Sequence, residues 1–175
     1  LEKAKRPSVI WLSFQECTGC TESLTRAHTA TVENLIFDSI SLDYHHTLQA
    51  ASGHAAEAAR EAAMEENYGE YLLVVDGSIP VGNPGYSTIA GISNVDMLKD
   101  TAAGAAAIVA VGSCAAFGGI TSAGGNPSEA CGLQYSGNQP GGLLGEAFHT
   151  DNDLPVINIA GCPTHPNWVT ETLLQ

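Results

Sequence analysis

Five short apolar segments are spaced along the chain, each with Gly, Asp or Ser near its carboxyl end. They are rich in Val, Ile and aromatic residues, which favour strands, and they span residues 8–14, 35–42, 71–79, 106–114 and 155–162. Their apolar residues form continuous runs instead of alternating with polar ones. Such runs predict strands that are buried on both faces, as in a parallel sheet.

Helix-like stretches lie between and after these segments, at residues 21–35, 53–69, 93–106 and 165–175. The second is rich in Ala and Glu and stops at Gly69, and the third opens with a capping-box pattern from Ser93 to Asp96. The fourth has Pro166 near its first turn, where proline is favoured. This alternation predicts an α/β fold, a flavodoxin-like doubly wound parallel sheet with helices on both faces.

Length and composition indicate one globular domain over residues 1–175, because 44% of the residues are hydrophobic and only 14% are charged. The glycine-rich segment 118–145 is too long for a simple connection, and we expect a functional or partner-facing loop there. The formal net charge of −13 repels phosphate backbones. Nucleic acid is therefore not expected as a partner.

Four of the five cysteines follow or end predicted strands. Cys17 and Cys20 follow the first strand, Cys114 ends the fourth and Cys162 ends the fifth. Because the carboxyl ends of parallel strands meet at one edge, where such sheets bind ligands, these four thiols are predicted to converge. Cys131 lies in the long loop and is interpreted as a free or packed thiol.

Convergent thiolates suit either Zn²⁺ or an iron–sulfur cluster, because both prefer sulfur to carboxylate oxygen. Zinc sites usually combine two local CxxC pairs, whereas here only Cys17 and Cys20 form such a pair and Pro163 follows the last cysteine. That pattern favours a cluster. A redox disulfide is less favoured, since it needs no third and fourth cysteine at the same edge. An odd number of cysteines also argues against a complete disulfide framework.

Several longer motifs carry a family resemblance: ECTGCTESLTRA, SLDYHHTLQAASGHAAEAA, VGSCAAFGG, GGNPSEACGLQ and PVINIAGCPTHPNWV. Over essentially its whole length the chain resembles the small subunit of nickel–iron hydrogenases, although Ala160 stands where Pro is common in that family. A related quinone-oxidoreductase subunit has two adjacent cysteines where this chain has CTGC, which favours the hydrogenase type.

The resemblance implies that Cys17, Cys20, Cys114 and Cys162 bind one proximal 4Fe–4S cluster. The chain would then be the electron-transfer subunit of a hydrogenase heterodimer, an oxidoreductase that reversibly oxidises H₂ to protons and electrons. Its large-subunit partner would hold the nickel–iron site, so no catalytic residue is expected in this chain. Oxygen-tolerant relatives have extra cysteines where this chain has Gly19 and Gly119, so a standard cubane is implied.

Family members of this type usually continue into a second domain with medial and distal clusters, which residues 1–175 do not include. We expect either a truncated longer chain, which we favour, or a short one-cluster form like those of cytoplasmic enzymes. The amino-acid sequences of these motifs resemble those of respiratory uptake hydrogenases. This resemblance implies a periplasmic, membrane-associated protein with a membrane cytochrome or another electron acceptor as a further partner; a cytoplasmic location is the alternative.

Single residues near these motifs have two interpretations each. Glu16 is either a loop acid near a helix N-terminus or, by the resemblance, part of a proton route. Thr21 is either a helix cap, which we favour, or a hydrogen-bond donor to cluster sulfurs. Asp76 ends the third strand at the same edge as the cysteines, but an Asp-Gly pair is first of all typical of a turn. His45 and His46 are not expected to share an ion, because neighbours on a strand point to opposite faces. The alternative function is a self-contained four-cysteine zinc or redox domain that binds a partner without electron transport.

Overall fold

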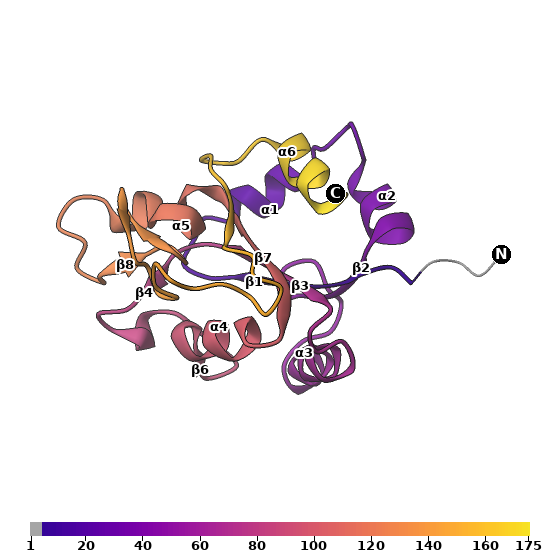
Figure 1. Cartoon of the computed structure of the whole chain (residues 1–175), viewed down its shortest axis with the longest axis horizontal. Coiled ribbons are helices and arrows are strands. Elements are labelled where there is room, and N and C mark those ends of the chain that lie inside the picture. The colour runs from indigo at the N-terminus through magenta and orange to yellow at the C-terminus, as the bar shows by residue number, and fades with distance from the viewer. Residues whose placement is uncertain (1–4) are drawn as a thin grey trace.

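A parallel five-stranded sheet forms the centre of the molecule (Figure 1), in the order β11-β7-β3-β1-β2. The computed structural model describes residues 5–175, so residues 1–4 of the predicted domain lie outside the described part. The strands are β1 (Ser8–Ser13), β2 (Ser41–His45), β3 (Tyr71–Asp76), β7 (Ala105–Val111) and β11 (Ile157–Ile159). Taken in chain order, the second, first, third, fourth and fifth strands lie side by side. This flavodoxin-like order confirms the predicted fold class.

Helices cover both faces of the sheet (Figure 1). On one side lie α1 (Gly19–Leu24), α2 (Val32–Asn34) and α6 (Pro166–Leu173), and on the other α3 (His54–Glu66) and α4 (Asn94–Ala102). Val9 and Trp11 of β1 pack toward the first group and Ile10 and Leu12 toward the second. All four side chains are buried, which explains why the strand is continuously apolar.

The second predicted strand is present but begins later than expected. The segment Leu35–Ser39 forms a π-helical turn that continues α2, and β2 begins only at Ser41. Thr31 starts this helical segment, because its side chain accepts a hydrogen bond from the Asn34 backbone N–H at 3.3 Å. The predicted helix over 21–35 is accordingly split into α1 and α2.

Other helix signals are confirmed. The Ser93 hydroxyl accepts a hydrogen bond from the Asp96 backbone N–H at 3.1 Å and so caps α4. Helix α6 begins at Pro166, and α3 ends at Glu66, ahead of Gly69. Within residues 5–175, no helix has the length and apolar character needed to cross a membrane.

The fourth predicted strand is too long at its carboxyl end. Strand β7 stops at Val111, and α5 (Gly112–Phe117) begins directly after it. Gly112 has a φ of 86°, a backbone conformation that favours glycine and turns the chain out of the sheet. Cys114 therefore lies on a helix at the sheet edge and not in the strand itself.

The glycine-rich segment 118–145 contains short ordered elements: the 3-10 turn η3 (Gly119–Ser122), β8 (Ala130–Cys131), β9 (Tyr135–Ser136) and β10 (Gln139–Pro140). Strand β8 pairs antiparallel with β4 (Ile79–Pro80), while β9 pairs with β10. The turn η2 (Pro84–Tyr86) and the hairpin of β5 (Thr88–Ile89) and β6 (Ile92–Ser93) precede α4. Leu133 is fully buried, so the segment packs onto the domain near the carboxyl edge.

Candidate metal centre

One cavity at the carboxyl edge of the sheet is lined by all four predicted cysteines, Cys17, Cys20, Cys114 and Cys162. They reach it from the segments that follow β1, β7 and β11. The rest of its lining consists of Glu16, Gly19, Gly77, Ser113, Ile120, Gly161 and Pro163. The expected convergence of these thiols is therefore present in the fold. Their role as ligands stays a prediction.

Backbone pairing fixes the segment that carries the first two cysteines. The Phe14 N–H donates to the Asp76 carbonyl at 2.8 Å, and Gln15 forms an isolated antiparallel bridge with Ser78. Thr18 then adopts a left-handed conformation with φ of 63°, and α1 begins at the next residue. This turn leaves Cys17 before the helix and Cys20 in its first turn.

The segments that carry the other two cysteines are tied to each other. The Ser113 N–H donates to the Gly161 carbonyl at 2.8 Å, and the Gly161 N–H donates to the Ser113 hydroxyl at 3.1 Å. Ser113 precedes Cys114 and Gly161 precedes Cys162, whose peptide bond to Pro163 is cis. These two bonds therefore hold the second pair of thiols in a fixed relative position.

Glycines leave room between the thiols. A Cβ on Gly112 would clash with Sγ of Cys20, and a Cβ on Gly119 would lie 2.8 Å from Sγ of Cys114. Both glycines also have positive φ, 86° and 59° respectively, which L-residues rarely adopt. The space beside the sulfurs is thus one that any larger residue would fill. Such a cradle fits a bulky group bound to several cysteines.

Burial and mutual repulsion work against ionised thiols in the cavity. Burial raises the pKa of the Cys20 thiol to about 11. Burial also raises the pKa of Cys114, and the nearby Cys162 and Cys17 add to that shift. A positively charged metal group among the sulfurs would offset this cost, because metal binding stabilises thiolates.

The spacing of the side chains bears on the kind of metal group. Among residues 5–175, no three or more His, Cys, Asp or Glu side chains are spaced to hold one metal ion. A zinc ion needs its sulfurs about 2.3 Å from a single point. A multi-iron cluster spreads its cysteine ligands over a larger body and takes thiolates as its usual ligands. The four thiols around the cavity are thus ligands of the kind that an iron–sulfur cluster takes, and the choice of a cluster over one zinc ion stays a prediction.

Glu16 lies on the cavity wall with an unusual carboxyl group. Its Oε2 atom is buried and has no hydrogen-bond partner among residues 5–175. Burial, followed by the negative charge of Asp76, raises the pKa of Glu16 to about 7. A carboxyl group of this kind exchanges a proton near neutral pH. The geometry is compatible with the predicted proton route, which stays a prediction.

Asp76 is the main polar residue that the sequence interpretation underestimated. Its side chain is fully buried, where Oδ1 accepts a hydrogen bond from the Trp11 indole at 3.1 Å and Oδ2 accepts one from the Thr21 hydroxyl at 2.9 Å. The prediction of Thr21 as a helix cap is wrong, because Thr21 lies inside α1 and points at the end of β3. The available signal was an acid that ends an otherwise apolar strand at the cysteine edge.

Three further predicted residues lie away from the cavity lining. Cys131 is only 6% exposed, and its Sγ donates to the Ile79 carbonyl at 3.8 Å, so its interpretation as a packed thiol is confirmed. His45 is buried whereas His46 is exposed, as expected for neighbours at a strand end. Their ring centroids lie 6.4 Å apart.

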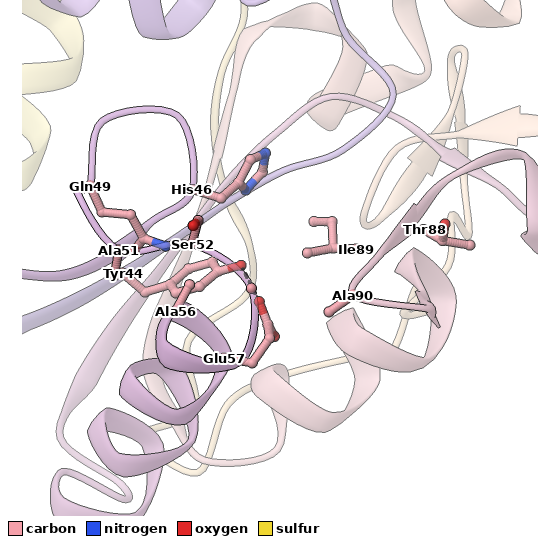
Figure 2. A pocket seen from close by; sticks show the side chains of 11 residues that line it. Tyr44, His46, Gln49, Ala51, Ser52, Ala56, Glu57, Thr88, Ile89 and Ala90 are labelled. Atoms are coloured by element: carbon pink, nitrogen blue, oxygen red, sulfur yellow. Dashed lines mark hydrogen bonds between the residues drawn. The ribbon is translucent and has the colours of Figure 1, made fainter.

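A second cavity, of about 400 Å³, lies between β2, α3 and the β5–β6 hairpin (Figure 2). Tyr44 donates its hydroxyl to Glu57 at 2.8 Å in this cavity, and Glu57 also pairs with the buried guanidinium of Arg60 at 3.1 Å. These polar groups already satisfy one another. None of the four cysteines lines this cavity.

Comparisons with known proteins identify relatives of the whole domain. Residues 17–175 match the family described as NADH ubiquinone oxidoreductase, 20 Kd subunit. The chain is 49% identical over 164 residues to the hydrogenase-2 small chain of Escherichia coli K12, a match that covers 93% of this chain and 40% of that protein. It is 39% identical over 175 residues to the periplasmic [NiFe] hydrogenase small subunit 1 of Nitratidesulfovibrio vulgaris, covering 99% of this chain and 51% of that protein.

A solved structure gives the same result. The recombinant [NiFeSe] hydrogenase from Desulfovibrio vulgaris Hildenborough matches 97% of this chain and 59% of its own chain, with a TM-score of 0.84 and 35% identity. The chain thus spans roughly half the length of these relatives. The chain belongs to the family of the 20 Kd subunit of NADH ubiquinone oxidoreductase, and its predicted resemblance to the small subunits of nickel–iron hydrogenases is confirmed.

Proposed function

We propose that this chain is the electron-transfer small subunit of a nickel–iron hydrogenase, which oxidises H₂ reversibly to protons and electrons. The cavity shared by Cys17, Cys20, Cys114 and Cys162 is the observation that carries this proposal. The similarity to hydrogenase small subunits and the family match support an iron–sulfur cofactor. We further propose one 4Fe–4S cluster of the ordinary cubane type, with one cysteine for each iron.

Each group in the cavity has a defined task in this proposal. An iron–sulfur cluster, when bound, supplies one-electron transfer. The four cysteines hold it, and Gly112 and Gly119 leave space for it beside the sulfurs. Ile120, which is 68% exposed and lies on the same wall, restricts the access of water once a partner covers it. Glu16 holds or releases a proton at its carboxyl group, since its pKa is raised to about 7.

The partner of this chain would be a large subunit that carries the nickel–iron site. The small-subunit names of the relatives support such a heterodimer. Cys17 and Cys162 are exposed at the cavity mouth in the isolated chain, and a covering subunit would protect them from solvent. The name of the N. vulgaris relative supports a periplasmic location. Association with the membrane through a cytochrome or another electron acceptor is a further part of the proposal.

Anaerobic co-purification followed by metal analysis tests this function. We expect a brown protein that contains iron and sulfide and co-purifies with a larger, nickel-containing chain. A colourless protein with stoichiometric zinc and no iron would instead support a self-contained zinc domain. An iron-loaded chain that is stable and monodisperse without any partner would contradict the obligate heterodimer.

A further inference from the structure

A continuous hydrogen-bond network lies buried next to the four-cysteine cavity. The Thr47 N–H donates to Nδ1 of His45 at 3.3 Å, so the hydrogen-bond pattern assigns the ring proton to Nε2. This Nε2 lies 3.4 Å from the Thr21 hydroxyl, which itself donates to Oδ2 of Asp76 at 2.9 Å. The Trp11 indole donates to Oδ1 of Asp76 and stacks on the His45 ring, with centroids 5.1 Å apart. The hydrogen-bond network thereby connects β1, β2, β3 and α1.

The Asp76 side chain accepts hydrogen bonds in this network. Its side chain is 0% exposed, and each carboxylate oxygen receives a donor, one from Trp11 and one from Thr21. Two donors and no acceptor satisfy a carboxylate but leave a carboxylic acid with an unused proton. The next residue, Gly77, lines the cavity, so a negative charge lies directly behind the cavity wall. Burial raises the pKa of Asp76, whereas the hydrogen bonds from Thr21 and Trp11 and the nearby His46 favour its charged form. Asp76 in turn raises the pKa of Glu16.

Helix α1 depends on this hydrogen-bond network for its position. It has six residues, too few for stability by itself, and its N-cap residue Thr18 makes no side-chain capping bond. Thr21 is only 2% exposed and directly follows Cys20. Its bond to Asp76 fixes the first turn of α1 on the end of β3, and with it the backbone of Cys20.

We propose that Thr21 is a positioning residue that joins α1 to the Asp76 carboxylate, and that this pair tunes the reduction potential of the group held by Cys20 and the other three cysteines. This inference rests on the proposed function. A hydroxyl donor draws charge away from a carboxylate, and in a low-dielectric interior that effect is large. Without the donor, the less neutralised charge makes the addition of an electron to the neighbouring group less favourable.

Thr21→Val tests the positioning role, because valine keeps the shape of threonine and lacks the donor. Thr21→Ser keeps the hydroxyl, and Thr25→Val is the matched control at the end of the same helix, where an exposed hydroxyl donates to the Glu22 carbonyl at 2.7 Å. The iron-loaded protein is purified anaerobically with its co-purifying subunit, and its potential is measured by titration followed by electron paramagnetic resonance. We expect a more negative potential for Thr21→Val and wild-type potentials for Thr21→Ser and Thr25→Val.

Asp76→Asn provides the second measurement, which also serves if Thr21→Val does not fold. Removal of the negative charge should make the potential more positive, and Thr21→Val should shift it much less in the Asp76→Asn background than in the wild type. An unchanged potential for Asp76→Asn, or equal shifts for Thr21→Val and Thr25→Val, would overturn the inference. A wild-type protein without iron would instead overturn the proposed function on which the inference rests.

Discussion

Ser23 of α1 donates its hydroxyl to the backbone carbonyl of Thr164 at 2.7 Å, although the two residues are 141 positions apart in the sequence. Ser23 shares α1 with Cys20, and Thr164 lies just after Cys162. This bond therefore joins two of the cysteine-bearing segments directly. Residues other than the four cysteines thus help to hold the four thiols in fixed relative positions.

Ser23→Ala should lower the free energy of unfolding by about 1–2 kcal/mol, because the Thr164 carbonyl loses its hydroxyl donor in a site where Thr164 is 1% exposed. The measurement is the urea midpoint of the metal-free chain. Thr25→Ala is the control, since its hydroxyl is exposed. Equal losses for both variants would mean that the Ser23 bond has no special role.

Cys162→Ser and Cys114→Ser should each lose most of the bound iron, because a harder oxygen replaces a thiolate at a site built for sulfur. Cys131→Ser should retain it, since Cys131 is buried against Ile79 and does not line the cavity. Iron per chain, measured after anaerobic purification, distinguishes the two groups. The ligand assignment is wrong if Cys131→Ser removes as much iron as Cys162→Ser.

Gly112→Ala should also lose iron, although no ligand is changed. The new Cβ would clash with Sγ of Cys20 and displace it from the cavity. Gly124→Ala is a matched control, because Gly124 has a φ of 68° and nothing lies within 4 Å of the position that its new Cβ would take. Both substitutions carry the backbone cost of positive φ, about 1–2 kcal/mol. Similar iron contents in the two variants would show that the space at Gly112 is not needed.

His45 should make the chain sensitive to acid. Burial lowers the pKa of His45 from 6.5 to about 4, with a smaller effect from His46. Between these values the unfolded chain binds a proton that the folded chain does not, so the contribution of His45 to stability is complete above pH 6.5 and is lost as the pH falls toward 4. The loss is on the order of 3 kcal/mol.

Urea midpoints of the wild type and of His45→Gln between pH 4 and pH 7 check this expectation. Glu16 acts in the opposite sense, because its raised pKa removes stability as the pH rises toward 7. That contribution is common to both proteins, so the difference between the two curves isolates His45. His149→Gln, at an exposed histidine, should follow the wild-type curve. Parallel curves for all three proteins would contradict the prediction.

The bound cluster should show a single redox transition. Gly19 and Gly119 stand beside Cys17 and Cys114, where a glycine offers no additional ligand atom. One cysteine for each iron therefore remains, as in an ordinary cubane. Redox titration followed by electron paramagnetic resonance is the measurement. A second oxidation at high potential would show that the cluster is of another type.

The sequence by itself determined the class of fold and the edge at which the thiols meet. Continuous apolar runs indicated a sheet buried on both faces, and Ser93 and Pro166 marked the starts of α4 and α6 correctly. These signals are local, because a capping pattern and a continuous apolar run each involve residues within a few positions of one another. Once the sheet is parallel, the cysteines that follow its strands must lie at its carboxyl edge.

Only the tertiary structure decided how that edge is built. Thr21 meets Asp76 across 55 positions and Ser23 meets Thr164 across 141, and no local pattern indicates which hydroxyl will find which acceptor. The apolar run at 35–42 is helical at its start, where Leu35 is buried, and Ile40 is buried in extended conformation directly after the helical turn. Burial and hydrogen bonding in three dimensions outweigh such weak local preferences, since an unpaired polar group in the interior costs more than an altered helix or strand boundary.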